Sequence, residues 1–75
     1  MKFRIGALYE IHFKDHTVGI RFPVECKAVG YVVEDNKEFV LLTPWWPFTD
    51  DMEIFNSNIE EYVVLKVCIT KKRLL

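Results

Sequence analysis

The chain has 75 residues and a net charge of −1, so it is long enough for one small domain and does not carry the positive charge of a general polyanion binder. The hydrophobic fraction is 51% and the aromatic fraction 15%. This composition excludes intrinsic disorder and supplies the apolar surface that so small a core must bury. We therefore expect residues 1–75 to form a single folded domain.

The cysteines and the first residues predict the compartment. Cys26 and Cys68 are too few for a disulfide scaffold, and each lies in an apolar stretch where a free, buried thiol is expected. Lys2 and Arg4 stand where a secretory signal needs an apolar segment. Because apolar runs in the sequence are much shorter than the ~20 residues of a membrane helix, we expect an intracellular, cytoplasmic protein without membrane association.

Alternation of polar and apolar residues predicts a strand near the start of the chain. Tyr9, Ile11 and Phe13 alternate with polar residues, which is typical of a strand whose odd positions face a core. Residues 2–5 alternate in the same way. Gly6 then marks either a bend between two stretches or a bulge in one longer strand.

The middle of the chain predicts a β-hairpin. Residues 25–34 and 39–43 are rich in β-branched and aromatic residues, and the tip between them, 34–38, is polar. Gly30 lies inside the first of these runs and indicates strong bending. The stretch before the hairpin, residues 20–24, fits either a short strand or a loop.

The last part of the chain predicts two more strands. The first strand covers residues 62–65 and the second covers residues 70–75, with a helical turn or a bend at 66–69 between them. The alternative is a single helix over 60–75, which the β-branched residues of this stretch disfavour. The expected fold is all-β, a small, strongly bent barrel of five strands with a short helical turn before the last one. Closing such a sheet also removes its exposed edges.

Three fragments in this order resemble a known group of proteins. They are 9–15 (YEIHFKD), 26–35 with 40–42 (CKAVGYVVED and VLL), and 65–74 (LKVCITKKRL). Their order is similar to that of small SH3-like barrel proteins, above all uncharacterised microbial and phage-borne ones. The resemblance implies an SH3-like barrel and brings no catalytic residue or cofactor with it, while the segments 44–48 and 18–23 depart from the group's pattern.

The segment Pro44-Trp45-Trp46-Pro47-Phe48 holds both tryptophans between two prolines, which interrupt any long strand or helix. Its rings have two interpretations: a lid that closes one mouth of the barrel, which the small size of the domain favours, or a recognition surface. Extended backbone directs neighbouring side chains to opposite sides, so a core position for one indole is compatible with an exposed position for the other. Carboxylates that follow the rings favour a protein partner, or a second copy, over a phosphate backbone. The predicted binding residues are Trp45, Trp46, Phe48, Asp50 and Asp51.

Nucleic-acid binding is the alternative function. Lys66, Lys71 and Arg73 would then contact phosphates while one indole stacks on a base. Alternation places Lys71 and Arg73 on one face of the last strand and Lys72 on the other, so one patch does not hold all of them. The structural interpretation is a solvated edge strand that charge protects from pairing.

The sequence predicts neither a catalytic nor a metal site. His12 and His16 lack the three or four convergent ligands of a zinc site. Neither Cys26 nor Cys68 has an evident oriented base in the sequence. The predicted function is therefore that of a non-enzymatic binding or adaptor module without a cofactor.

Overall fold

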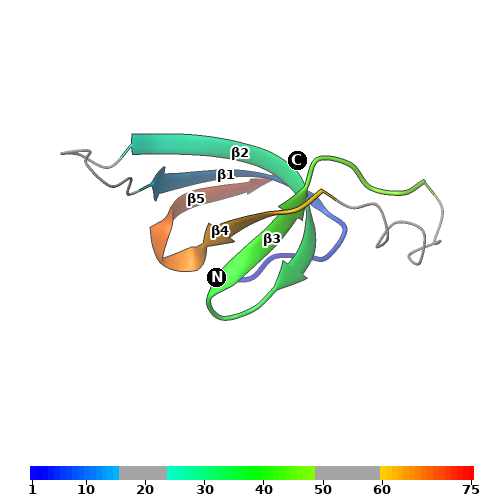
Figure 1. The fold of residues 1–75 in the computed structure, drawn as a ribbon, viewed down its shortest axis with the longest axis horizontal. Helices are drawn as coiled ribbons and strands as arrows, with labels where there is room; N and C mark the ends of the chain where they lie inside the picture. The colour runs from blue at the N-terminus through cyan, green and yellow to red at the C-terminus, as the bar shows by residue number, and fades with distance from the viewer. Residues whose placement is uncertain (16–23, 49–59) are drawn as a thin grey trace.

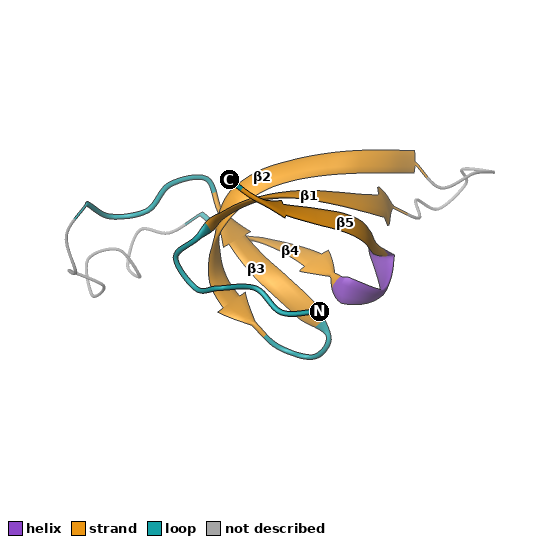
Figure 2. Cartoon of the chain, turned by 180° about the vertical axis from the view of Figure 1, so that it is seen from behind, coloured by secondary structure: helices purple, strands orange, loops and turns teal. Residues whose placement is uncertain are grey.

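A computed structural model describes residues 1–15, 24–48 and 60–75. In these residues the chain is all-β, as predicted: five antiparallel strands form one sheet in the order β4-β3-β2-β1-β5 (Figure 1). A single 3-10 turn, η1, precedes the last strand (Figure 2), so the helical turn is confirmed and the alternative helix is wrong. The elements are β1 (Leu8–Asp15), β2 (Val24–Asp35), β3 (Phe39–Thr43), β4 (Tyr62–Leu65), η1 (Lys66–Cys68) and β5 (Ile69–Leu74).

The predicted hairpin is the pair β2 and β3, and its tip is closed by one asparagine. The amide of Asn36 donates to the carbonyl of Phe39 at 3.1 Å. Its side-chain oxygen accepts from the backbone amides of Glu38 at 2.9 Å and Phe39 at 3.0 Å. Asparagine suits this position because its side chain satisfies turn amides that no strand partner reaches. Of the uncertain stretch 20–24, Val24 begins β2 and the rest lies outside the described residues.

β2 is the long strand that bends the sheet. Its first part pairs with β1 as far as Tyr31, and its last part pairs with β3, with a bulge between Val32 and Glu34. Figure 1 shows β2 curving from one layer of the domain into the other. Bulges increase local bending and twist, so this one helps to fold the sheet over itself.

Gly30 allows a close crossing next to this bend. A Cβ atom at Gly30 would lie 2.4 Å from the hydroxyl oxygen of Tyr62. That hydroxyl donates to the carbonyl of Val29 at 2.8 Å, and burial raises the pKa of Tyr62. Gly30 is therefore required for contact with the first residue of β4, which refines the bending role predicted for it.

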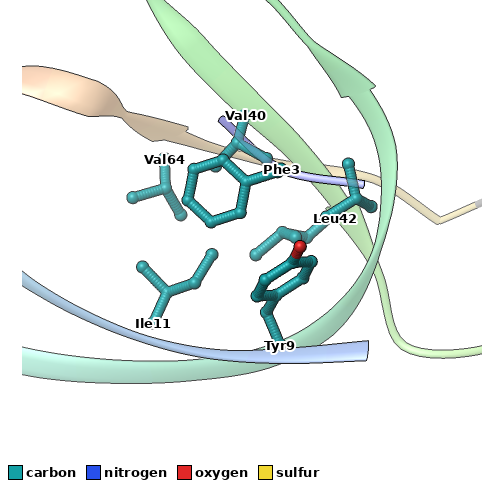
Figure 3. Close-up of a cluster of buried hydrophobic side chains, with 7 residues drawn as sticks. Phe3, Tyr9, Ile11, Val40, Leu42 and Val64 are labelled. Carbon is teal, nitrogen blue, oxygen red and sulfur yellow. The ribbon is translucent and has the colours of Figure 1, made fainter. Parts of the chain in front are cut away.

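The core lies between the two layers of the bent sheet. Tyr9 and Ile11 of β1 point toward side chains of β3 and β4 (Figure 3), which confirms the inward orientation predicted for the odd positions of β1. Phe3 enters the same cluster from the N-terminal segment, and its ring meets that of Tyr9 edge-on at 5.0 Å. The buried cluster consists of Phe3, Tyr9, Ile11, Val32, Val40, Leu42 and Val64.

The sheet is not closed, so the predicted barrel is not confirmed. Among the described residues, β4 pairs only with β3 and β5 only with β1, and these two strands are the ends of the sheet. The three residues of η1 lead from β4 directly into β5, whose ladder is formed with β1. The backbone thus gives β5 a partner other than β4.

Residues 1–7, which we call the N-terminal strap, do not form a strand. Gly6 has φ of +79° and its amide donates to the carbonyl of Val32 at 2.8 Å, so the bend is the correct alternative at this glycine. Because Phe3 is only 6% exposed, the strap inserts a large ring into the core. The amide of Phe3 donates to Asp35 at 3.2 Å, which fixes the strap to the end of β2.

Two lysines also hold the strap. The Lys66 ammonium lies 2.5 Å from the Asp35 carboxylate and donates to the carbonyl of Met1 at 2.9 Å. Lys72 donates to the carbonyl of Lys2 and stands 4.8 Å from the centre of the Phe3 ring, within cation–π range. The strap is thus held by η1 and β5 through side chains.

Candidate binding surface

The proline-flanked aromatic segment follows β3 and begins at Pro44. The ring of Trp46 is 6.2 Å from that of Tyr31, tilted by 32°. A Cβ atom at Gly6 would lie only 3.2 Å from the Trp46 ring. Trp46 is thus half-buried against the strap turn and a residue of β2, close to a glycine whose positive φ other residues rarely adopt.

The two neighbouring aromatic residues are more exposed. Trp45 is 39% exposed and Phe48 is fully exposed at 106%. Asp50 and Asp51, the acidic rim predicted from the sequence, lie outside the described residues. We call the group Tyr31, Trp45, Trp46 and Phe48 the aromatic surface.

The lid interpretation predicted that a ring of this segment closes one mouth of the barrel. The large rings of the buried core are those of Phe3 and Tyr9, and Trp46 is half-buried outside this cluster. The sequence pattern did not identify Phe3 as a core residue, because the alternating residues around it are typical of an ordinary strand. Its aromatic side chain between two charged residues was the available signal.

The aromatic surface borders the side of β1, β2 and β5 that faces away from the core, which we call the outer face. Strand register places its residues in cross-strand rows. The first row pairs Tyr31 with Leu8, and the next two each span three strands. The second row is Val29, Glu10 and Arg73, and the third, which we call the basic row, is Lys27, His12 and Lys71.

Glu10 is the electrostatic centre of the outer face. Its carboxylate is 2.7 Å from the guanidinium of Arg73, 3.5 Å from the ammonium of Lys27 and 3.7 Å from the ring of His12. Desolvation raises the pKa of Glu10, but the positive charges of Arg73 and Lys27 lower it by more, so its pKa lies below the ordinary value. Glu10 therefore stays ionised and partly neutralises its neighbours.

The predicted phosphate-contact residues are divided between two places. Lys71 and Arg73 share the outer face, whereas Lys72 reaches inward to Phe3, as the alternation predicted. Lys66 lies away from them, with a side chain only 13% exposed and paired with Asp35. Lys27 and His12 join Lys71 instead, a grouping that depends on strand register and that the sequence pattern did not reveal.

The described residues contain no group of three or more His, Cys, Asp or Glu side chains able to hold a metal ion. A hollow of about 390 Å³ beside the strap is lined by Asp35, Lys66 and Lys37 among others, but the first two already form an ion pair. Cys26 and Cys68 are free and half-buried. Over the same residues the structure contains no helix of the length and apolarity needed to cross a membrane.

Comparisons with known proteins add no relative. The chain matches no protein-family description, no curated protein and no solved structure. The resemblance of residues 9–15, 26–42 and 65–74 to SH3-like barrel proteins therefore stays an expectation from the sequence.

Proposed function

We propose that the protein is a non-enzymatic binding module that uses its aromatic surface to contact a protein partner, with a second copy of the chain as one such partner. The observation that carries this proposal is the unequal burial of adjacent rings. Trp46 is held against Tyr31 and Gly6, while in the same short segment Trp45 is 39% exposed and Phe48 is fully exposed. Exposed aromatic rings on an anchored segment are typical of the residues that dominate protein interfaces.

The backbone of this segment supports the same role. Pro44 and Pro47 restrict φ on either side of the indoles. A segment with fewer accessible conformations loses less entropy when it binds. The prolines therefore favour a preformed contact surface over a freely mobile loop.

Nucleic-acid binding has weaker support. Lys71 and Arg73 do share a face, but Arg73 is paired with Glu10 at 2.7 Å and Lys66 is committed to Asp35. A phosphate backbone would meet a carboxylate at the centre of this face. We therefore favour a protein partner, and we place the protein in the cytoplasm, where its two free thiols would stay reduced.

The test is a peptide-display selection against the folded protein, with Kd values of the enriched peptides measured by fluorescence polarisation. Sedimentation velocity at increasing protein concentration tests self-association in parallel. We expect Phe48→Ala and Trp45→Ala each to weaken binding or association by about tenfold or more. Val67→Ala is the matched control, because Val67 is an exposed apolar side chain on η1.

Two results would overturn the proposal. One is a set of peptides that binds both aromatic variants as tightly as it binds the parent protein. The other is a monomeric protein that enriches no peptide at all. Melting temperatures of all variants show whether a loss of binding reflects unfolding.

A further inference from the structure

The outer face connects the aromatic surface to the basic row without a break. Along β2, Tyr31 is followed on this face by Val29 and then by Lys27. Two strand residues span about 6.6 Å, so the basic row begins about 13 Å from Tyr31. In an extended peptide that covers both places, the two contacts therefore lie only about four positions apart.

The basic row offers side chains that are open to a partner. Lys27 and His12 have side chains 60% and 40% exposed. Lys71 is exposed and forms no ion pair with any described residue, and the same is true of Lys14 at the next outer-face position of β1. These two ammonium groups can therefore accept a new carboxylate without first breaking a contact.

Charge is unevenly distributed in the molecule. The whole chain has a net charge of −1. On the outer face, four cations face two carboxylates, which leaves an excess of positive charge at neutral pH. Such segregation steers partners of opposite charge and favours their correct orientation. The four cations are Lys14, Lys27, Lys71 and Arg73, and the carboxylates are Glu10 and Glu25.

The arrangement of the charges distinguishes peptides from nucleic acids. Between the aromatic surface and the basic row lies the row of Val29, Glu10 and Arg73, which holds one apolar side chain and one ion pair and so carries no excess charge. A peptide can place an uncharged residue over this row, whereas a nucleic acid brings a phosphate at every nucleotide. The face therefore fits a chain with carboxylates at one end only.

We infer that the partner is an acidic peptide segment with an apolar anchor. The anchor contacts the aromatic surface, and carboxylates about four residues away contact the basic row. This inference rests on the proposed function and adds the chemical class of the partner. It also assigns Lys27, His12 and Lys71 as recognition residues.

The experiment uses labelled ten-residue peptides and fluorescence polarisation at low and high salt. The first peptide carries one Trp and three Glu residues, and the Glu residues are centred four positions from the Trp. It is made in two versions, with the Glu residues either before or after the Trp. Matched versions replace the Glu residues by Gln, or the Trp by Ala, and a ten-nucleotide oligo-dT is the nucleic-acid probe. We expect the Glu peptide to bind at least about tenfold more tightly than the Gln version, with the difference reduced by salt.

Variants locate the interaction. Lys71→Glu should remove the preference for the Glu peptide over the Gln peptide. Lys71→Gln should reduce the difference in binding free energy between these two peptides by at least half. Lys37→Glu is the control, since Lys37 is an exposed lysine at the hairpin tip. Amide shifts in NMR spectra should change at Tyr31, His12 and Lys71 when the Glu peptide is added.

The outcomes separate the two proposals. Equal binding of the Glu and Gln peptides, with loss of binding for the Trp→Ala peptide, would overturn the acidic partner and leave the aromatic surface intact. Equal binding of the Trp and Ala peptides would overturn the proposed function itself. Tighter binding of oligo-dT than of the Glu peptide would replace the acidic peptide by a nucleic acid, and binding of none of the probes would also reject the inference.

Discussion

Lysines from one short stretch of sequence have different roles at the strap end and on the outer face. At the strap end, where η1 and β5 hold the N-terminal strap, they make structural contacts, and on the outer face they are open to a partner. Lys66, which is half-buried, and Lys72, which is exposed, both bind strap carbonyls and stand over the Phe3 ring. Lys71 and Arg73 point outward beside His12 and Glu10. Because side chains alternate along a strand, β5 divides one basic cluster into a structural half and a half available for recognition.

The environment of Lys66 differs from that of the outer-face lysines. The Lys66 and Asp35 side chains are only 13% and 17% exposed, and their charges are 2.5 Å apart. A poorly solvated charge must keep its partner, so this pair maintains the position of the strap. The outer-face lysines are solvated and contribute little to stability. Their positive charge can therefore be used for binding.

The strongest way to break the strap end is Phe3→Ala. Removing a buried aromatic ring should lower the free energy of unfolding by about 3–5 kcal/mol, measured by urea denaturation. The control is Ile5→Ala, because Ile5 belongs to the same strap but is exposed. Equal effects of the two substitutions would show that Phe3 does not anchor the strap.

Gly30→Ala tests the bend that brings the two layers of the sheet together. The added methyl group would overlap the Tyr62 hydroxyl, so we expect a loss of about 1–3 kcal/mol in urea denaturation. Tyr62→Phe in the same background should recover part of this loss, since it removes the overlapping oxygen. A neutral Gly30→Ala variant would contradict the close crossing.

The Asp35 carboxylate predicts an acid sensitivity of the strap end. Partial burial raises the pKa of Asp35, but hydrogen bonds from Lys66 and the Phe3 amide, together with the Lys66 charge, lower it by more. A carboxylate whose folded-state pKa is depressed stabilises the fold above its unfolded pKa and loses this contribution as the pH falls below about 4. Urea denaturation of Asp35→Asn between pH 2 and pH 7 should show a weaker decline than the parent protein. A parallel decline would exclude Asp35 as a source of acid sensitivity.

The smallest effects sharpen the contrast within β5. Lys72→Gln should cost about 1 kcal/mol, because it removes a cation from the Phe3 ring and weakens the contact with the strap. Lys71→Gln should stay within about 0.5 kcal/mol, because Lys71 is exposed and forms no ion pair with any described residue. Thermal melts of the two variants in the same buffer give the comparison. An equal cost would mean that alternation does not separate their roles.

Local patterns predicted most of the strands, but not how they meet. The alternation of Tyr9, Ile11 and Phe13 and the polar tip around Asn36 identified β1 and the hairpin correctly, because both depend on neighbouring residues. The basic row was not predictable, because it joins Lys27, His12 and Lys71 through two strand registers. A pairing register is set by long-range packing, which a single sequence does not display.

The sequence by itself determined an all-β chain, its hairpin and the helical turn before β5. It also determined that Lys71 and Lys72 lie on opposite faces of β5. These features follow from local turn chemistry and from the two-residue period of a strand. Only the tertiary structure decided that Phe3 enters the core, that Trp46 lies on Tyr31 and that β4 and β5 remain the ends of an open sheet. These features depend on contacts between distant segments, such as Asp35 with Lys66 and Gly6 with Trp46. Which ring is buried is settled by the space that the bent sheet leaves, and that space exists only after the strands have packed.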